Sequence, residues 1–392
     1  GGGSVGQYGP LVHFGATLGI AVKRFVSSRL SHEVYLGCGV AAAISAGFGA
    51  PIAGIVFAHE AILRHFSVRA IAPISIASVT ASAVSQSFFN TSATFNISTS
   101  APDLVSVIPV LIIASPIIAI AAIVYMEALR RSVAIAKLTG WSAERLVITA
   151  ATICGLVGIW IPEILGLGIG TINTMLDGVY QLPALILLLI TKIAMTALCI
   201  GFGLFGGVFS PALFIGVAVG GVISQVAIFL GVPDLSVAIS IAAMAAVAAN
   251  VIGAPVAAVL IILELTQSYA YAVAALMAVM ASMLLTHRLF GHSFFDRQLL
   301  DRGIDLSLGR EAIALSQHTL ETHLSDEYIK IDETTSGQAA LELMRQAEQT
   351  EAYVVSDSGR LAEKLSVPQA IQADNQTVFQ FADADPVLLN LD

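Results

Sequence analysis

The sequence predicts an all-α integral membrane protein made of two related halves, followed by a small α/β segment. Three observations support this fold class. Of the 392 residues, 56% are hydrophobic and only 11% are charged, and the mean hydropathy is +0.85, whereas soluble domains carry about 25% charged residues. Several apolar segments are long enough for a membrane-crossing helix, which needs roughly 20 residues. A glycine–proline pattern occurs twice, about half a chain length apart.

The repeated pattern has two blocks with matched spacing. The first block is Gly6-Gln7-Tyr8-Gly9-Pro10 in one copy and Gly207-Val208-Phe209-Ser210-Pro211 in the other, and further glycines follow each copy at the same distances. The second block lies downstream in each half, where a Gly-Ala-Pro segment, Gly49–Ala53 or Gly253–Ala257, precedes a glutamate. Duplicated halves with Gly/Pro breaks in apolar segments are typical of transport pathways at the repeat interface.

Five apolar segments are long enough to cross a bilayer as helices. They are residues 67–89, 104–127, 146–162, 183–205 and 270–290. Four shorter apolar segments begin at or beside a proline: Leu11–Phe25, Pro51–Leu63, Pro211–Leu230 and Pro255–Leu265. Proline suits the first turn of a helix because an N–H there has no acceptor within the helix. Helices that begin inside a membrane must line a cavity or be covered by protein.

The composition changes after about Arg302, where acidic residues become frequent. Asp326–Ile331, Ser336–Glu348 and Ala352–Val355 predict a strand, an amphipathic helix and a second strand. This pattern indicates a small cytoplasmic α/β unit. The predicted units are a membrane domain (1–302), a linker (303–322) and a small α/β domain (323–392).

The two glycine–proline copies are suited to hold an anion. The first turn of a helix has N–H groups without acceptors and carries about half a positive charge. Glycines let the backbone approach an ion closely. Weak binding by several amides permits rapid conduction, because the ion is not trapped. We interpret Gly6–Pro10 and Gly207–Pro211 as the two halves of one anion site. The alternative is that both are kinks that serve only to pack helices.

These blocks resemble the CLC family of chloride channels and chloride/proton antiporters. The family pattern is Gly-(Lys/Arg)-Glu-Gly-Pro for the first copy and Gly-x-Phe-x-Pro for the second, and Gly291–Asp296 also resembles a family segment. The resemblance covers residues 1–302. It implies an inverted-topology repeat of tilted, broken helices in a homodimer with one pore per subunit. A further family anion loop, Gly-Ser-Gly-x-Pro, has no counterpart here, so we expect N-terminal helices to be missing.

Three departures from the family pattern bear on mechanism. The family's gate glutamate aligns with Tyr8, whose phenol stays neutral at physiological pH. The second proton-relay position aligns with Ala61, where family antiporters carry a glutamate. The family's pore tyrosine aligns with Phe295, which lacks the hydroxyl contact to the anion, although Phe295 as an ordinary interface aromatic is the alternative. The sequence thus lacks both carboxylates on which proton exchange in the family depends.

Four ionisable residues near these blocks have a structural and a functional interpretation. Glu60 and Glu264 occupy matching positions in the two halves, and we expect both to accept backbone N–H bonds rather than to carry protons. His59 lies next to Glu60, and His13 follows the first block by three residues. Both histidines invite a proton-relay role. A lone histidine on a helix more often packs or forms a hydrogen bond, and we favour that interpretation.

The remaining polar and sulfur-containing residues point to no catalytic or metal chemistry. Lys192 and Arg145 are cations in an apolar region, where they border the anion path or, as we favour, extend to the membrane interface. The cysteines are small buried side chains by their apolar surroundings, and no spacing indicates a metal ligand set. We therefore predict that the chain is not an enzyme. The net charge of −9 gives no indication of nucleic-acid binding. The three cysteines are Cys38, Cys154 and Cys199.

The sequence therefore predicts a passive, chloride-selective anion channel, multi-pass in the membrane and expected in the bacterial inner membrane. Two alternatives stay open: a proton-coupled antiporter whose relay uses His59 or Glu60, and a weakly conducting regulatory protein whose pore Tyr8 plugs. The expected partners are chloride and similar anions, the lipid bilayer and a second copy of the chain. We predict no cofactor for the membrane domain. The C-terminal segment resembles a CBS domain, which implies a nucleotide as its candidate ligand.

Overall fold

The computed structural model describes residues 2–26, 30–89, 102–291, 293–301, 303–304, 328–356 and 361–383. The chain forms two compact units, Gly1–Ile304 and Asp305–Asp392. The described residues of the first unit are arranged in helices, and those of the second unit include a three-stranded sheet. Nearly all of the linker predicted at 303–322 lies outside the described residues.

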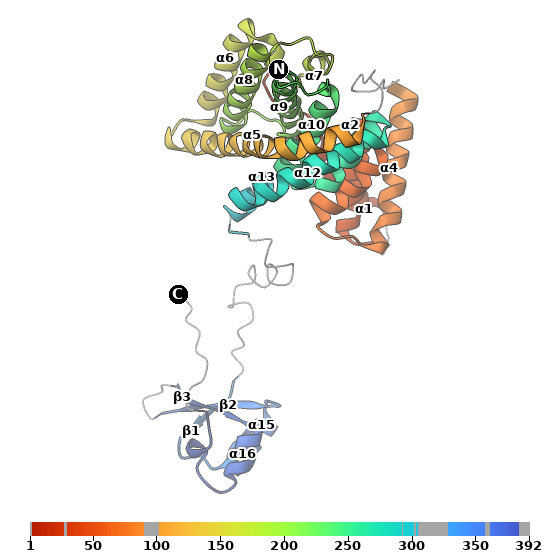
Figure 1. Ribbon diagram of the computed structural model, residues 1–392. Helices are drawn as coiled ribbons and strands as arrows, with labels where there is room; N and C mark the ends of the chain where they lie inside the picture. Colours follow the sequence, from red (N-terminus) through yellow and green to blue (C-terminus); the bar gives the residue numbers. More distant parts are fainter. Residues whose placement is uncertain are drawn as a thin grey trace. The chain divides into compact units, whose positions relative to one another are not determined.

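The first half of the membrane unit is a compact group of helices (Figure 1). It consists of α1 (Tyr8–Phe25), α2 (His32–Phe48), α3 (Pro51–Phe57), the π-helix η1 (Ala58–Leu63) and α4 (Val68–Phe89). Helices α1 and α2 touch backbone to backbone, because a Cβ atom on Gly15 would lie only 2.4 Å from the carbonyl oxygen of Gly39. Helix α2 ends at Gly49, whose φ of 68° turns the chain sharply into α3.

The middle of the chain supplies a long helix that packs against the second half. The elements are α5 (Leu104–Leu138), α6 (Ala143–Trp160), the 3₁₀ turn η2 (Pro162–Ile164), α7 (Ile169–Leu176) and α8 (Leu182–Gly201). Helix α5 lies against α8, α9, α10 and α12 (Figure 1). It is longer than the apolar segment predicted there, because its last turns carry charged residues that pair on the helix surface, Glu127 with Arg130 and Arg131.

The second half repeats the first. It consists of α9 (Phe209–Phe229), α10 (Ser236–Ile252), α11 (Pro255–Thr266), α12 (Tyr269–Leu289) and α13 (Phe294–Leu300). Helices α9 and α10 also meet through a glycine, since a Cβ atom on Gly216 would lie 2.7 Å from the carbonyl oxygen of Ala243. Helix α10 has 17 residues, as α2 has, and ends at Gly253 with a φ of 79°. The sequence repeat is therefore a structural repeat.

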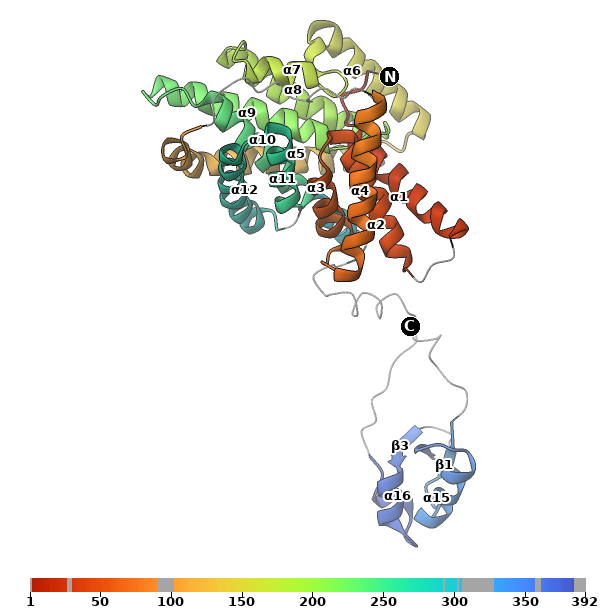
Figure 2. The ribbon, with the colours of Figure 1, turned by 90° about the vertical axis from the view of Figure 1, so that its right-hand side faces the viewer.

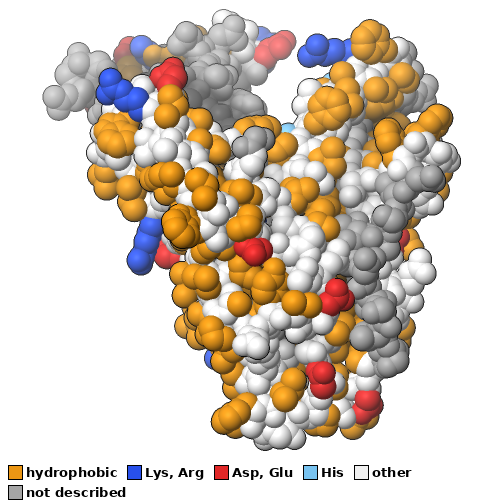
Figure 3. Space-filling model, turned by 90° about the horizontal axis from the view of Figure 1, so that it is seen from above, with side chains coloured by type: hydrophobic (Ala, Val, Ile, Leu, Met, Phe, Trp, Pro, Cys, Tyr) orange, Lys and Arg blue, Asp and Glu red, His pale blue; other side chains and the backbone are white. Residues whose placement is uncertain are grey.

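The membrane character predicted from hydropathy is confirmed. Within the described part of the chain, six helices are long and apolar enough to cross a membrane: α4, α5, α6, α8, α9 and the helical stretch that starts with α12. The five predicted spans correspond to α4, α5, α6, α8 and α12. Apolar side chains are spread over the face drawn in Figure 3, and charged ones are few. This surface is suited to contact with lipid.

Two helix starts differ from the prediction. Helices α1 and α9 begin at Tyr8 and Phe209, so Pro10 and Pro211 are third residues rather than first ones. The proline still lies in the first turn, where its missing N–H costs no hydrogen bond. Helix α9 also proved long enough to span a membrane, but protein surrounds most of it, including Phe214, which is fully buried.

The second unit is a small α/β structure with its own core. It contains β1 (Lys330–Asp332), α15 (Gly337–Gln346), β2 (Glu351–Val355), β3 (Leu361–Ser366), α16 (Val367–Ala373) and the 3₁₀ turn η5 (Val378–Gln380). Strand β2 is central, parallel to β1 and antiparallel to β3. Helices α15 and α16 lie together on one side of the sheet (Figures 1 and 2). The predicted strand–helix–strand order is present, and β3 and α16 are additional.

Candidate functional site

The two copies of the glycine–proline pattern lie side by side in the membrane unit. Gly6 and Gly207 form an antiparallel bridge in which each N–H donates to the other residue's carbonyl oxygen at 2.7 Å. A Cβ atom on Gly6 would lie 2.8 Å from the carbonyl oxygen of Gly207, and one on Gly207 would lie 2.7 Å from the nitrogen of Gly9. Any side chain at either position would push the segments apart. Glycine is therefore required for this pairing.

Two helix starts meet directly beyond this bridge. Helix α1 begins at Tyr8 and α9 at Phe209. In each helix the third residue is proline, and the fourth residue donates the first helical hydrogen bond to the residue before the helix. The first two amides of each helix therefore have no acceptor within the helix. They belong to Tyr8 and Gly9 in α1 and to Phe209 and Ser210 in α9, at the positive ends of two helix dipoles.

Three aromatic rings pack together at the two helix starts. Tyr8 stacks on Phe48 with ring centroids 3.7 Å apart and an angle of 11° between the planes. Phe209 meets both rings edge-on, at 5.7 Å from Tyr8 and 5.2 Å from Phe48. All three side chains are buried. The Tyr8 hydroxyl donates a long bond, 3.5 Å, to the carbonyl of Gly47. We call Tyr8, Phe48 and Phe209 the aromatic cluster.

Two further polar groups lie at the start of α9. The hydroxyl of Tyr125, a fully buried residue of α5, donates to the carbonyl oxygen of Val208 at 3.1 Å and so holds the segment before α9 in place. The Ser210 hydroxyl is buried and has no hydrogen-bond partner. Sequence reasoning missed Tyr125. Its signal was a single phenol inside a long apolar segment, since a buried hydroxyl needs a partner.

Each of the two matching glutamates caps a helix start in the other half of the membrane unit. The carboxylate of Glu60 accepts the N–H groups of Val256 and Ala257, at 3.0 and 2.8 Å, at the start of α11. The carboxylate of Glu264 accepts two N–H groups at the start of α3, at 2.9 and 2.7 Å. This reciprocal arrangement confirms the prediction that both glutamates accept backbone N–H bonds. It also places a negative charge at two positive helix ends, which stabilises both.

The residues around Glu60 form the π-helix η1. Ala61, the position aligned with the family's proton relay, carries no ionisable group. His59 is 1% exposed, stacks on Phe66 at 5.2 Å, and holds its Nδ1 3.1 Å from the carbonyl oxygen of His65. A carbonyl only accepts, so Nδ1 is the donor of this hydrogen bond. The Nε2 atom of the same ring is buried and has no partner among the described residues. His13, in contrast, is exposed on α1.

Phe295 lies on α13, away from the aromatic cluster. Its side chain is 40% exposed and its ring is 5.7 Å from that of Phe294. No ring contact joins Phe295 to Tyr8 or Phe209 in the part of the chain that the structure describes. The structure thus brings Gly6–Pro10 and Gly207–Pro211 together but not Phe295, and the anion-binding roles of all three stay predictions.

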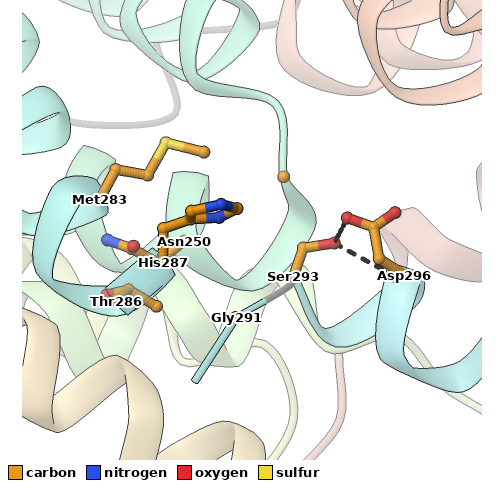
Figure 4. Close-up of a pocket in the computed structure, with 8 residues that line it drawn as sticks. Asn250, Met283, Thr286, His287, Gly291, Ser293 and Asp296 are labelled. Carbon is orange, nitrogen blue, oxygen red and sulfur yellow. Dashed lines mark hydrogen bonds between the residues drawn. The ribbon is translucent and has the colours of Figure 1, made fainter. Parts of the chain in front are cut away.

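A pocket of about 220 Å³ lies beside the start of α13 (Figure 4). Within it, the Ser293 hydroxyl donates to the carboxylate of Asp296 at 2.7 Å. The same carboxylate pairs with Arg64 at the end of η1. This ion pair joins the end of η1, in the first half, to α13, in the second half. The pocket lining includes Asn250, Met283, Thr286, His287, Ser293 and Asp296.

Lys192 corrects the expectation that it extends to the membrane interface. Its side chain is fully buried on α8, and its ammonium donates to the carbonyl oxygens of Ile164 and Gly166 at 2.8 and 3.0 Å. These carbonyls replace water, so the lysine does not need to reach the interface. Arg145, in the first turn of α6, is exposed, as predicted.

The cysteines have no partner that would suggest a site. Cys154 and Cys199 are buried, Cys38 is partly buried, and all three are free thiols. No group of three or more His, Cys, Asp or Glu side chains within the described ranges could hold a metal ion. The chemistry that this structure offers is therefore concentrated at the paired helix starts, where amides and one hydroxyl are available to an anion.

Comparison with known proteins gives a consistent result. Residues 1–287 match the family model described as voltage gated chloride channel. The chain is 28% identical over 314 residues to a putative chloride channel protein, ClcB-like, of Ralstonia nicotianae. It is also 28% identical over 314 residues to the H(+)/Cl(-) exchange transporter ClcA of Vibrio cholerae. The alignments cover 76% of this chain, but 71% and 66% of these relatives, so the chain spans about two thirds of their length.

Solved structures show the same fold. The structure of a slow cyanobacterial Cl-/H+ antiporter superposes with a TM-score of 0.70 at 19% identity, covering 77% of this chain and 72% of that one. A CLC-type fluoride/proton antiporter superposes with a TM-score of 0.64 at 22% identity, covering 75% and 72%. At these identities the likeness concerns the fold alone.

Proposed function

The chain belongs to the voltage-gated chloride channel family, and we propose that it is a passive, chloride-selective anion channel rather than a proton-coupled antiporter. It is an integral membrane protein, and its relatives place it in the bacterial inner membrane. The observation that carries the proposal is the Gly6–Gly207 pairing, which brings two helix starts with free amides to one point. Amides and dipoles there offset the loss of an anion's hydration shell without a fixed charge in contact with the ion.

We propose that protons are not coupled to the anion, because the two carboxylates that carry protons in the family are replaced here and a third carboxylate is held by hydrogen bonds. Tyr8 stands at the gate position and Ala61 at the relay position, and neither can exchange protons at physiological pH. Glu60 is the carboxylate next to Ala61 in the sequence, but both of its oxygens accept N–H groups at the start of α11. A proton on Glu60 would weaken those two hydrogen bonds. Glu60 is therefore a poor carrier.

We propose that the aromatic cluster is the gate of this pathway. The rings of Tyr8, Phe48 and Phe209 pack at the helix starts where the anion is to bind. The Tyr8 ring must therefore move for an ion to pass. The hydrogen bond from its hydroxyl to Gly47 is long, so this bond puts little restraint on such a movement. The inverted-topology repeat and the homodimer with one pore per subunit, which the family resemblance implies, belong to the same proposal.

The test is an electrical measurement on the purified protein in liposomes. With a chloride gradient, the reversal potential of a passive channel follows chloride alone. When only the pH gradient is then changed, we expect the reversal potential to stay where it was. A shift under this condition would mean that protons move with the anion, and it would exclude a passive channel.

One observation favours the antiporter as a second candidate. The Nε2 atom of His59 is buried without a partner, next to Glu60 in the sequence. If His59 replaced the usual relay, a chloride gradient would drive proton uptake, and His59→Ala would abolish the proton flux while chloride flux continued. The passive channel predicts no such proton flux in either protein.

For residues 323–392 we propose a CBS-like regulatory unit with a nucleotide as its ligand. The support is limited to the arrangement of elements, in which a helix joins two parallel strands and a third strand completes the sheet. Calorimetric titration of the full chain with ATP tests this assignment. Heat of binding that saturates is the expected result, and its absence would remove the nucleotide from the proposal.

A further inference from the structure

Lys192 is a buried cation without an anionic partner. Its side chain is fully buried in the middle of the apolar helix α8. Two of its three N–H groups point to the carbonyls of Ile164 and Gly166, and the ammonium lies 5.0 Å from the centre of the Phe214 ring. Lys192 forms no ion pair within the described residues. Carbonyls and a ring face solvate the charge, but they do not neutralise it.

The surroundings of Lys192 add to the positive potential. Gly168, the residue directly before α7, comes so close that a Cβ atom on it would lie 3.7 Å from the lysine Nζ. The positive end of the α7 dipole therefore lies beside the ammonium. Among the residues that the structure describes, the ionisable neighbours of Lys192 are the thiols of Cys154 and Cys199, from α6 and α8. This part of the membrane unit thus has a positive charge that no described side chain balances.

This charge lies next to the elements that form the junction of Gly6 and Gly207. Phe214, which the ammonium faces, is five residues after Phe209 on α9, a rise of about 7.5 Å along the helix. Gly166, which accepts a hydrogen bond from Lys192, donates its own N–H to the carbonyl of Gly3. Lys192 is thus connected to both segments that pair at the junction. Phe214 is seven residues after Gly207, a helical rise of about 10 Å, so the charge and the junction are separated by a distance on the order of 10 Å.

We propose that Lys192 is a fixed buried charge that sets the anion affinity of the junction without touching the ion. The inference rests on the proposed anion site at the paired helix starts. A cation at about 10 Å attracts an anion strongly enough, at an effective dielectric constant of about 20, to change its dissociation constant about tenfold. The ion contacts amides and not the ammonium. The charge therefore raises the affinity of the site for the anion, and the anion can still dissociate. Lys192 does not contact the anion; it acts on the anion through its electrostatic field.

The first experiment removes the charge and keeps the polar head. Chloride binding to the full chain in detergent is measured by calorimetry, starting from chloride-free buffer, and bromide is measured in the same way. We expect Lys192→Gln to raise both dissociation constants by about the same factor, near tenfold or about 1.4 kcal/mol. Lys192→Arg keeps the charge and is expected to keep the affinity. Equal affinity in Lys192→Gln and the parent protein would overturn the inference.

A second pair of variants keeps the lysine and changes its neighbour. Cys154 lies close enough to Lys192 for their charges to interact. Cys154→Asp places a carboxylate beside the ammonium, whereas Cys154→Asn has the same shape without the charge. If the field of Lys192 matters, Cys154→Asp binds chloride and bromide more weakly than Cys154→Asn does, by a common factor. Equal binding by the two variants would contradict the inference even if Lys192→Gln does not fold.

A structural role for Lys192 gives a different pattern. Loss of the hydrogen bonds to Ile164 and Gly166 alone would lower the melting temperature and would change the two halide affinities unequally, because the site would change shape rather than potential. Such a result would overturn the inference. If the parent protein itself binds no chloride, the anion site at the helix starts is wrong, and the failure lies with the proposed function.

Discussion

The two halves of the membrane unit share a backbone but not a surface. The first copy places α1 against α2 through Gly15 and Gly39, and the second places α9 against α10 through Gly216. Yet α1 exposes large apolar side chains, with Phe14 63% and Phe25 89% accessible, whereas α9 is buried from its start to Gly221 and exposes large apolar side chains near its C-terminal end. The duplication has therefore kept the helix starts and their close packing, while the outer surface of each half has been free to change.

At the junction itself the copies differ at three positions. Gln7, Tyr8 and Gly9 of the first copy correspond to Val208, Phe209 and Ser210 of the second. Both copies provide two amides without an acceptor in the helix, and the second adds a buried hydroxyl, that of Ser210, with no hydrogen-bond partner among the described residues. In the proposed channel the shared backbone would hold the anion, and the differing side chains would decide how the ion is admitted and how tightly it is held.

The largest effect is expected where the two copies touch. A methyl group on Gly207 would meet the Gly9 nitrogen at 2.7 Å, so Gly207→Ala must separate the paired segments. We expect a loss of about 3 kcal/mol in the free energy of unfolding and loss of chloride flux. Thermal denaturation in detergent and a liposome flux assay measure the two.

A matched glycine provides the control. A methyl group on Gly155, in the interior of α6, would meet nothing within 4 Å. Gly155→Ala is therefore expected to leave stability unchanged or to raise it slightly, because alanine favours a helix. Full flux in Gly207→Ala would show that the antiparallel bridge is not needed for the anion path.

The reciprocal glutamate caps test the symmetry of the two halves. Glu60→Ala and Glu264→Ala each remove a carboxylate that holds two backbone N–H groups. We expect each to lower the free energy of unfolding by about 2 kcal/mol, the upper end for a helix cap, and by similar amounts. Glu127→Ala, which loses only surface ion pairs, is the control and should cost under about 1 kcal/mol. Clearly unequal losses of unfolding free energy in Glu60→Ala and Glu264→Ala would show that the two caps do not contribute equally to stability.

The aromatic cluster tests the difference at the gate. Tyr8→Ala removes the ring that stacks on Phe48 and opens the helix starts, so we expect chloride flux to rise about tenfold, or about 1.4 kcal/mol in barrier height. Tyr8→Phe makes the first copy like the second at this position. It should leave the flux near that of the parent, because the lost hydrogen bond is long. Unchanged flux in Tyr8→Ala would mean that the ring does not obstruct the path.

The helices were predictable because a membrane span depends on length and hydropathy alone. Helices α4, α5, α6, α8 and α12 appear where the sequence placed them. The starts of α1 and α9 were placed too late, because proline marks the first turn of a helix and not its first residue. Strand β3 was missed because its sequence, with Glu363 and Lys364 at its centre, lacks an alternating apolar pattern.

The contacts that join the two halves were not predictable. Matching positions of Glu60 and Glu264 indicate a shared role, but not that each glutamate serves the other half. That assignment needs the halves to be placed against each other in space. The prediction that Lys192 extends to the membrane interface was wrong for a similar reason. Its solvation inside the protein depends on carbonyls from a turn 26 to 28 residues away in the sequence, which no local pattern reveals.

The smallest expected effect concerns Ser210, which takes the place of Gly9 in the second copy. Its hydroxyl is buried and has no partner within the described ranges, so removing it relieves a desolvation penalty, and Ser210→Ala should be as stable as the parent or slightly more stable. If the hydroxyl donates to a bound anion, the same variant should raise the chloride dissociation constant about fivefold, or about 1 kcal/mol. Calorimetry and thermal denaturation on one sample measure both.

Ser224 supplies the opposite case on the same helix. Its hydroxyl is buried on α9 and donates to the carbonyl of Gly221 at 3.0 Å, within the helix. Ser224→Ala should therefore lose stability, by about 1 kcal/mol, and keep its chloride affinity. The two serines then show crossed effects, with affinity lost at Ser210 and stability lost at Ser224. Unchanged chloride affinity in Ser210→Ala would mean that the anion contacts only what the two copies have in common, the amides of their helix starts.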